Sequence, residues 1–475
     1  MLPVTVAKPP TDTQARLDAW IKDQPGGVAV AWVDADGTAF FQAGKFASDD
    51  PRTITADTPF ELGSVTKVFT ALLLAESERL GKVRLGDPAA KYLLAPGDPV
   101  QPVLAKITLL SLATHTSGLP RLPANIGANP DANPDPYATY DRATLADALR
   151  THGPDAPVGR AVVYSNFGVA VLGEALAAAW GATYANALRD HVLAPLGLKA
   201  TSVGLAGAPP PAGLAPGHAS GQRVPNWTFQ AFAAAGGVRS SARDLALFLT
   251  ACLGDRDAPL RASIDATTRP QQGDIETGGH VGLGWMLTDD EERPVVWHNG
   301  ATAGSHAFVA FSPKTGTGVA ILANEQKEPE ALGFALLGAK PPQPPRFAVA
   351  NAGDYVGRYS LSSAFAIDVT TMSGLLFAQP TGQGRVTLRQ IETDRFSVVG
   401  VAAEVSFERG PGGKIASLSC IKMAATNARR AAIFLHRQRR SFCRRKRSPT
   451  MSGSIHSRPS SPSQSRCATE SFWLR

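Results

Sequence analysis

The sequence has no uninterrupted apolar run of 18 or more residues, so it predicts no membrane-spanning helix. The first ten residues also lack the basic start and long apolar stretch that mark a secretory signal. Lys8 follows the apolar residues, and Pro9-Pro10 closes the segment. We therefore expect a cytoplasmic protein if this N-terminus is complete, and otherwise a missing start of the reading frame.

Cysteine is scarce, and three of the four cysteines lie after residue 419. Cys252 alone remains in the rest of the chain, which excludes an internal disulfide there. It follows an apolar segment and is predicted to be a buried core thiol. No CxxC, HExxH or other Cys/His spacing indicates a metal site, so we expect neither a metal nor a cofactor.

Acidic residues are almost absent from the C-terminus. Residues 420–475 hold 13 of the 47 Lys and Arg but one of the 40 Asp and Glu, Glu470. Residues 1–419 then carry 34 basic and 39 acidic groups, so the net charge of +7 comes from the C-terminal segment. We expect no nucleic-acid binding by the folded part; a genuine basic tail is the alternative that would bind nucleic acid.

The chain length of 475 residues predicts two domains. Residues 1–340 carry strand patterns at both ends and a mostly helical middle, which is interrupted by Pro- and Gly-rich stretches at 121–140 and 206–225. Loops this long are often lids or binding loops. Strands are predicted at 28–33, 38–43, 295–297, 307–311 and 318–323. This arrangement predicts an α+β domain whose sheet joins distant parts of the chain.

A second domain is predicted after the Pro-rich run at 340–345, which makes residues 341–346 a stiff linker. Residues 347–419 alternate short apolar segments with Gly-containing turns, as expected of a small all-β, antiparallel, barrel-like domain. Beyond Ser419 the chain becomes Arg- and Ser-rich with no apolar period, so residues 420–475 are predicted to be disordered.

The abrupt change after Ser419 has a second interpretation. If the codon of Ser419 ends in C and the codons up to residue 425 are read one nucleotide earlier, Cys becomes Leu, Ile becomes His or Tyr, Lys becomes Gln, Lys or a stop, Met becomes Asn or Asp, and Gly follows. The version Leu-His-Gln-Asn-Gly would end the β-module as a strand and a turn. Our hypothesis is that residues 420–475 are translated out of frame, and the alternative is a genuine basic tail. The nucleotide sequence of the gene distinguishes the two.

The segment Phe60-Glu-Leu-Gly-Ser-Val-Thr-Lys67 places Ser64 and Lys67 at i and i+3 near a helix start. These positions share one helix face, so the Lys67 amine can reach the Ser64 hydroxyl. A serine needs a base to become nucleophilic, and burial in this apolar helix would lower the pKa of Lys67 enough for that role. The alternative is a capping serine and a solvated lysine.

Two further motifs bring polar groups to the ends of predicted elements. Tyr164-Ser-Asn166 precedes a helix of small residues that reaches Ala179, so a plain helix cap is its alternative reading. In Trp297-His-Asn-Gly-Ala-Thr302, a strand would deliver His298 to a sheet edge. Gly300 would remove a side chain that blocks substrate.

These three motifs, in this order, resemble the class C β-lactamases and their relatives, the D-Ala-D-Ala peptidases and esterases of penicillin-binding-protein type. The resemblance covers about residues 15–335. Residues 112–120, Gly236-Gly237 and residues 282–285 also look like that family. It implies an antiparallel sheet with a helical subdomain, and the β-module is similar to a domain fused to some members.

The resemblance also implies roles for the motif residues. Ser64 would form the acyl-enzyme, while Lys67 and Tyr164 move its proton. The backbone N–H groups of Ser64 and Ala301 would make the oxyanion hole. Asn166, His298 and Gly300 would then lie against the substrate.

Some residues resemble site residues but are expected to lie outside the site. Lys314-Thr-Gly316 spells the family's third motif literally, but Ser312-Pro at its start predicts an exposed turn between strands, so we favour His298. Lone histidines are usually structural, and we expect this of three of them: His115, His280 and His306.

Departures from the β-lactamase pattern leave the substrate open. His298 stands where a Lys would give a fixed positive charge, Asn299 replaces a hydroxyl residue, and Thr66 stands where many class C enzymes have Ser or Ala. The first hypothesis is hydrolysis of a β-lactam or a D-Ala-D-Ala-type amide. The alternatives are a carboxylesterase and a penicillin-binding sensor with negligible turnover. All three predict a small-molecule or peptide substrate; a cell-wall substrate would require export.

Overall fold

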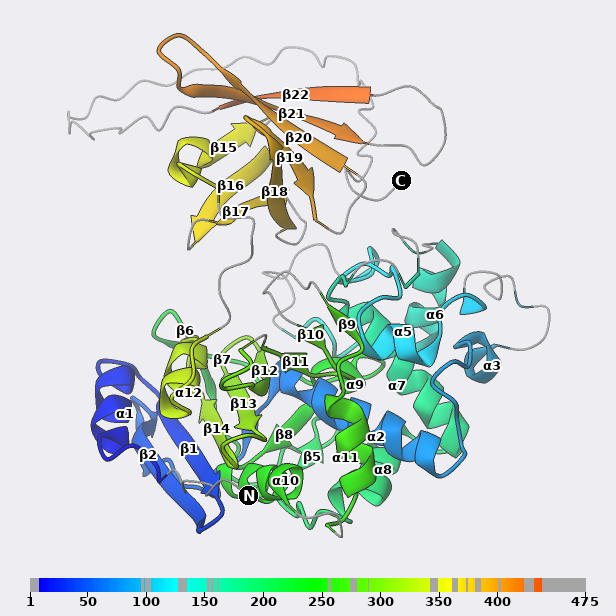
Figure 1. The fold of residues 1–475 in the computed structure, drawn as a ribbon, viewed down its shortest axis with the longest axis vertical. Coiled ribbons are helices and arrows are strands. Elements are labelled where there is room, and N and C mark those ends of the chain that lie inside the picture. Colours follow the sequence, from blue (N-terminus) through cyan, green and yellow to red (C-terminus); the bar gives the residue numbers. More distant parts are fainter. Residues whose placement is uncertain are drawn as a thin grey trace, which may run out of the picture. The chain divides into compact units, whose positions relative to one another are not determined.

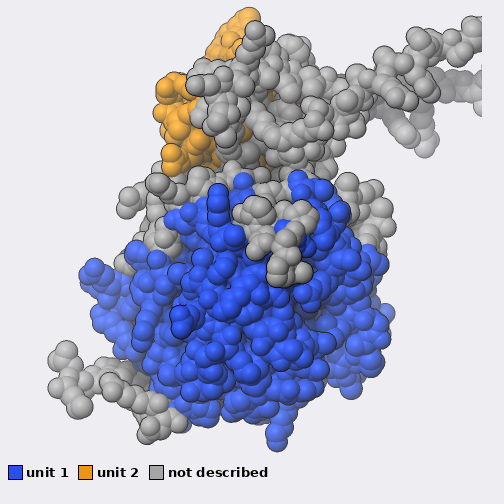
Figure 2. Space-filling model, turned by 90° about the vertical axis from the view of Figure 1, so that its right-hand side faces the viewer, with its two compact units in different colours: residues 1–346 blue, residues 347–475 orange. Residues whose placement is uncertain are grey.

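The structure is a computed structural model, and its chain divides into two compact units, residues 1–346 and 347–475 (Figure 2). Each unit is described by itself. The described residues are 8–94, 98, 104–126, 135–151, 154, 158–159, 162–254, 258–273, 280–288, 290–341, 349–360, 366–372, 375–380, 386–399, 403–422 and 431–437.

The first unit is built on a nine-stranded antiparallel sheet of strand order β3-β2-β1-β14-β13-β12-β11-β10-β9 (Figure 1). Its strands are β1 (Gly27–Asp34), β2 (Gly37–Ala47), β3 (Asp50–Thr53), β9 (Gln272–Gly273), β10 (His280–Val281), β11 (Met286–Leu287), β12 (Val296–Ala301), β13 (His306–Ser312) and β14 (Thr317–Ala323). Strand β1 pairs with β14, with Val30 opposite Ile321. The sheet therefore joins the two ends of the unit, as predicted.

Both faces of the sheet are covered, because successive side chains of the central strands point to opposite sides. In β1, Val28, Val30 and Trp32 pack with α1 (Thr13–Ile21) and α12 (Glu330–Leu336). Ala29, Ala31 and Val33 lie in a second, larger core that includes α10 (Ala242–Leu253). The unit is thus layered as helices, sheet and helices.

The larger core extends into the helical part of the unit. At its centre, the 3-10 turn η1 (Gly63–Val65) leads into α2 (Thr66–Arg79), whose residues 66–77 are all buried. The helices around it are α3 (Ala90–Leu93), α5 (Leu109–Ala113), α6 (Arg142–Thr151), α7 (Asn166–Trp180), α8 (Tyr184–Leu188), η2 (Arg189–Leu193), α9 (Ala233–Gly236) and α11 (Arg261–Thr268). The predicted buried helix after Ser64 is confirmed, with a tighter first turn.

Short strands complete this part of the unit. They are β4 (Phe60–Glu61), β5 (Ser202–Val203) and β8 (Val238–Ser240) in one sheet, and β6 (Gly217–Ala219) and β7 (Gln222–Val224) in a hairpin. The hairpin lies inside the stretch 206–225 that was predicted as a loop. No single described helix is long and apolar enough to cross a membrane; the bent pair Asn166–Trp180 and Tyr184–Leu193 passes that test of length and composition together.

The start of α10 has the sequence Ser241-Ala-Arg-Asp244, a pattern in which the side chains of the first and fourth residues can each accept a backbone N–H of the other. The Ser241 hydroxyl does accept the N–H of Asp244, at 3.2 Å. The Asp244 carboxylate, however, accepts from the N–H of Ala200 at 2.8 Å and the hydroxyl of Thr201 at 2.7 Å. A tertiary contact therefore takes the acceptor that the local motif would have used.

The second unit is a closed barrel in which each strand pairs with the next one along the chain. Its elements are η3 (Ala352–Tyr355), β15 (Gly357–Ser360), β16 (Ala366–Met372), β17 (Leu375–Pro380), β18 (Val386–Glu392), β19 (Arg395–Val398), β20 (Ala403–Arg409), β21 (Ile415–Lys422) and β22 (Ala431–Arg437). Aromatic rings fill one part of the core, where Phe396 and Phe407 lie 5.4 Å apart with nearly perpendicular planes.

The barrel extends past the predicted boundary at Ser419. Strand β21 runs to Lys422, and β22 pairs with both β21 and β15, which closes the barrel. The prediction of disorder from residue 420 is therefore wrong for these strands, because β21 pairs with β20 and β22, and β22 also pairs with β15. The remaining tail and residues 342–346 of the predicted linker lie outside the described residues. The reading-frame hypothesis stays a prediction.

Candidate active site

Ser64 and Lys67 meet as the sequence predicts. Ser64 lies in η1 and Lys67 in the first turn of α2, and Lys67 Nζ lies 2.9 Å from Ser64 Oγ. The same nitrogen donates to the carbonyl oxygen of Ala235, at 2.7 Å. This second contact holds the amine against the hydroxyl, so the orientation of the lysine is set by α9 as well as by its own helix.

The Lys67 side chain is 1% exposed, and its surroundings favour the neutral amine. Burial lowers the pKa of Lys67 well below its ordinary value, and the positive charge of Arg121 lowers it further. A neutral amine has a lone pair. With one N–H donated to Ala235, that lone pair is available for the proton of Ser64.

Tyr164 lies beside this pair. Lys67 Nζ is 4.9 Å from the centroid of its ring, and the Arg121 guanidinium carbon is 5.0 Å from it. Burial raises the pKa of the phenol, while Arg121 and hydrogen bonding with Ser64 oppose the rise. The phenol is therefore protonated at neutral pH and can donate a proton to a leaving group.

The Tyr164-Ser-Asn166 segment combines the two roles that the sequence left open, a helix cap and a contribution to the site. The Ser165 hydroxyl caps α7 by accepting the N–H of Gly168 at 2.8 Å. Asn166, the first residue of the helix, lines the cavity beside Ser64. Its Oδ1 is buried and has no partner among the described residues, which leaves an acceptor or, after an amide flip, a donor for a substrate.

His298 lies on β12 and is 1% exposed, with its ring centroid 6.3 Å from that of Tyr164. Burial, helped by Lys67 and opposed by its bond to the backbone, lowers the pKa of His298 to about 3. The imidazole is therefore neutral at physiological pH. Its Nδ1 lies 2.5 Å from the carbonyl oxygen of Asn299, so Nδ1 carries the proton and Nε2 is an acceptor.

Gly300 has a different structural role from the predicted one, which was to leave space for substrate. A Cβ at this position would lie 2.1 Å from the carbonyl oxygen of Leu62 and 2.7 Å from the N of Ser64. The missing side chain thus makes room for the turn that carries the nucleophile, rather than for substrate. Gly63, at φ +49°, similarly abuts the backbone of Ala301, which lines the cavity with Ser64. These contacts bring the two predicted oxyanion-hole residues together.

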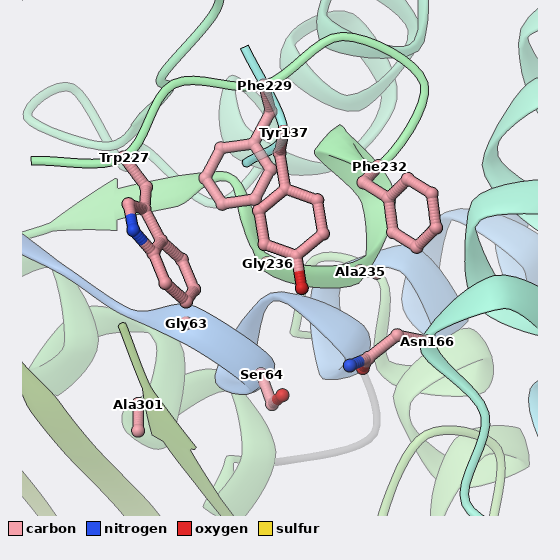
Figure 3. A pocket seen from close by; sticks show the side chains of 10 residues that line it. All are labelled: Gly63, Ser64, Tyr137, Asn166, Trp227, Phe229, Phe232, Ala235, Gly236 and Ala301. Atoms are coloured by element: carbon pink, nitrogen blue, oxygen red, sulfur yellow. The ribbon is translucent and has the colours of Figure 1, made fainter. Parts of the chain in front are cut away.

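A cavity of about 290 Å³ opens over Ser64. Figure 3 shows four aromatic side chains gathered on one side of it, with Asn166 and Ala301 on other sides. The aromatic residues are Tyr137, Trp227, Phe229 and Phe232. The Tyr137 ring stacks on Phe229 at 5.2 Å and lies 5.1 Å from Phe232, so the wall is one packed unit. This surface suits an apolar or aromatic part of a substrate.

The residues that depart from the family pattern have structural partners. The Thr66 hydroxyl accepts the N–H of Val238 at 2.9 Å, which ties α2 to β8. The Asn299 side chain donates to Glu330 of α12, on the other side of the strand from His298. Lys314 is exposed and donates to the carbonyl oxygen of Glu291, and Gly316 has φ +66°. The predicted exposed turn is confirmed.

Several residues of the site were missed by the sequence reading. His115, predicted to be merely structural, has its ring 4.5 Å from that of Tyr164. Its Nδ1 accepts the N–H of Ser165 at 3.2 Å, and burial with nearby cations lowers the pKa of His115 well below its ordinary value. The aromatic wall was also missed. The available signal was that Tyr137 lies in the predicted loop 121–140 and that the other three rings closely follow the predicted loop 206–225. His280 is exposed on β10, and His306 bonds to the carbonyl oxygen of Glu325.

The described residues do not meet the requirements of a metal site. Among the described residues, no three His, Cys, Asp or Glu side chains gather closely enough to hold one. Cys252 is buried, as predicted, and burial raises the pKa of its thiol.

Comparison with known proteins agrees with this geometry. The Beta-lactamase family profile matches residues 17–337. A beta-lactamase of Pseudomonas fluorescens is 28% identical over 346 residues, which cover 63% of this chain and 88% of the relative. Penicillin-binding protein 4 of Amycolatopsis lactamdurans is 29% identical over 333 residues, covering 66% and 84%.

A solved structure, the class C beta lactamase from Rhodobacter sphaeroides, matches with a TM-score of 0.58 at 26% identity. The match covers 69% of this chain and 98% of that one. The predicted α+β fold and the predicted resemblance are confirmed. With a family match over more than half of its length, the chain belongs to the beta-lactamase family of serine hydrolases.

Proposed function

We propose that the protein hydrolyses β-lactams or D-Ala-D-Ala-type amides through an acyl-enzyme on Ser64. The observation that supports this most directly is the buried amine of Lys67, 2.9 Å from Ser64 Oγ, whose pKa is lowered by burial. A base that already contacts the hydroxyl meets the geometric requirement for general-base activation, and the lowered pKa favours the form that can accept a proton.

The proposed reaction assigns each group one task. Ser64 Oγ attacks the carbonyl carbon while its proton passes to Lys67. The N–H groups of Ser64 and Ala301 stabilise the negative oxygen that develops. Tyr164 then donates its proton to the leaving nitrogen as the carbon–nitrogen bond breaks, and is reprotonated from Lys67. Water, deprotonated by the same pair, releases the acid and restores Ser64.

Substrate contacts are proposed for the remaining residues of the cavity. Asn166 offers its unpartnered amide oxygen or nitrogen, and His298 offers Nε2 as an acceptor. The aromatic wall would cover an apolar group of the substrate. A cell-wall peptide as the substrate would place the protein outside the cytoplasm, which cell fractionation tests.

A carboxylesterase is the second candidate function, and the protonation state of His298 favours it. A neutral imidazole supplies no fixed positive charge for the carboxylate that β-lactams and D-Ala-terminated peptides carry. Steady-state hydrolysis of a chromogenic cephalosporin and of a p-nitrophenyl ester separates the two functions. A stoichiometric burst without turnover would instead indicate a penicillin-binding sensor.

The test of the shared mechanism is mass spectrometry of the intact protein. After exposure to a β-lactam or a fluorophosphonate, the wild-type protein should gain the mass of one acyl or phosphonyl group. Ser64→Ala should gain none, and Ser111→Ala, on α5, is the matched control. An adduct that persists in Ser64→Ala would remove Ser64 from its proposed role.

A further inference from the structure

The interior of the site carries little positive charge for a substrate to use. Lys67 and His298 are buried, and burial lowers the pKa of each, which disfavours the charged form. Arg239 is buried too, but its Nη2 lies 3.7 Å from the Glu61 carboxylate. An anionic substrate therefore needs a cation from the rim of the cavity.

Arg121 is a cation beside Tyr164, close to the residues that line the cavity although not one of them. Its guanidinium carbon lies 5.0 Å from the ring centroid of Tyr164, the same ring that lies 4.9 Å from Lys67 Nζ. Its charge is close enough to influence three buried groups of the site, Lys67, His115 and Tyr137. The guanidinium thus lies next to the groups that we assign to the reaction.

The backbone of Arg121 is fixed where the site needs it. Its carbonyl oxygen accepts the N–H groups of Asn166, at 3.0 Å, and Phe167, at 3.2 Å. These are the first residues of α7, so the same helix end holds both Asn166 and the Cα of Arg121 beside the cavity. A side chain anchored in this way loses less freedom when it binds a ligand.

The guanidinium of Arg121 is available for a ligand. The residue is exposed, and it forms no ion pair with any acidic side chain in the described ranges. By contrast, Arg142, Arg189 and Arg243 on the same unit each have a carboxylate within 4 Å. Guanidinium groups match carboxylates with two parallel hydrogen bonds, which makes a carboxylate the natural ligand.

We propose that Arg121 is a specificity-determining residue that binds a carboxylate of the substrate beside Ser64. The proposal rests on the acyl-serine function proposed above and narrows its substrates to carboxylate-bearing amides or esters. The fixed positive charge that is missing at His298 would then come from Arg121, in the segment between α5 and α6. The carboxylate belongs either to the acyl part or to the leaving group, and matched esters distinguish these two.

The test compares kcat/KM for two pairs of esters with the full chain. Mono-p-nitrophenyl succinate against p-nitrophenyl butyrate places the carboxylate in the acyl part. 3-Acetoxybenzoate against its methyl ester places it in the leaving group. The readout is the ratio of kcat/KM for the anionic ester to that for the neutral one, because a general effect of Arg121 on the pKa of Lys67 cancels in this ratio.

We expect Arg121→Gln to lower the ratio about tenfold for one of the two pairs, and Arg121→Lys to lower it less. High salt should shrink the wild-type preference, since the cation is exposed. Arg150→Gln, an exposed position on α6 with the same change of charge, should leave the ratio as it is.

Unchanged ratios for both pairs in Arg121→Gln would overturn the proposal, as would equal losses for the anionic and neutral esters. Equal losses would mean that Arg121 acts on the base alone. Failure of the proposed function looks different: Ser64→Ala would retain esterase activity, or the wild-type protein would not be acylated at all. Either of these results would overturn both proposals.

Discussion

Gly300 and Leu62 are in such close contact that a Cβ on Gly300 would lie 2.1 Å from the carbonyl oxygen of Leu62. The same Cβ would lie 2.7 Å from the N of Ser64. The strand that carries His298 and the turn that carries Ser64 are therefore packed backbone against backbone. Any side chain between them must displace Ser64.

We expect Gly300→Ala to lower the free energy of unfolding by about 1–3 kcal/mol through overpacking. Activity should fall by about 100-fold or more, because displacement of the Ser64 N–H weakens the oxyanion hole. Gly86→Ala is the matched control, since a Cβ there meets no atom within 4 Å. Thermal melts and ester hydrolysis check both effects; a fully active Gly300→Ala would contradict this packing.

Burial of Lys67 should cost stability while it enables catalysis. In the folded protein the pKa of Lys67 is lowered, so below its unfolded value near 10.5 the unfolded chain binds the additional proton. The stability cost is largest at low pH and disappears as the pH rises toward 10.5. We expect Lys67→Met to be inactive, and its stability relative to wild type to decrease steadily as the pH rises.

Denaturant unfolding from pH 6 upward measures this dependence, with Lys82→Met as the control at an exposed lysine. A wild-type minus Lys67→Met difference that does not change with pH would mean that the buried amine keeps its ordinary pKa. The same titration predicts that kcat/KM falls as the pH drops through the pKa of Lys67, because protonation removes the base.

His298 should be neutral over the whole physiological range, with its proton on Nδ1. The pKa of about 3 follows from burial, and the 2.5 Å contact with the carbonyl oxygen of Asn299 fixes the tautomer. Nitrogen-15 NMR of the histidine side chains, assigned by comparison with His298→Gln, should show no protonation of this ring at pH 5. The exposed His280 serves as the internal reference. Titration of His298 near pH 6.5 would contradict the assignment.

The aromatic wall predicts a preference among acyl groups. Trp227→Ala or Phe229→Ala should lower kcat/KM for a phenylacetyl ester about tenfold more than for an acetyl ester, because the aromatic group loses its packing surface. Phe41→Ala removes a ring on β2, outside the cavity, and should affect both esters alike. Equal effects of the Trp227 and Phe41 substitutions would show that the wall does not contact substrate.

The predictable part of the site consists of contacts that are short in sequence. Ser64 and Lys67 are three residues apart, so a helical turn by itself brings them together. The cap at Ser165 is equally local. The assignment of His298 to the site depended on the motif at residues 297–302 and on the strand predicted before it. The competing Lys314 was rejected because the Pro beside it indicated a turn.

Other features could not be read locally, because they depend on residues far apart in the chain. The Ala235 carbonyl that orients Lys67 is 168 residues away from it. The wall combines Tyr137 with three aromatic residues of the segment 227–232, and neither segment has a distinctive spacing. The strand at 431–437 was missed because its apolar run at 431–435 lies within basic sequence, and because its partner β15 is more than 70 residues away in the chain.

The sequence by itself determined the family, through the spelling and order of three motifs, and the α+β architecture. It also determined that Ser64 and Lys67 meet, because positions i and i+3 share one helix face. The tertiary structure alone decided the protonation of those groups and the purpose of Gly300. It also placed Arg121 beside Tyr164. Desolvation and close packing arise only when distant segments enclose the same space, and that enclosure is what turns an ordinary lysine into a base.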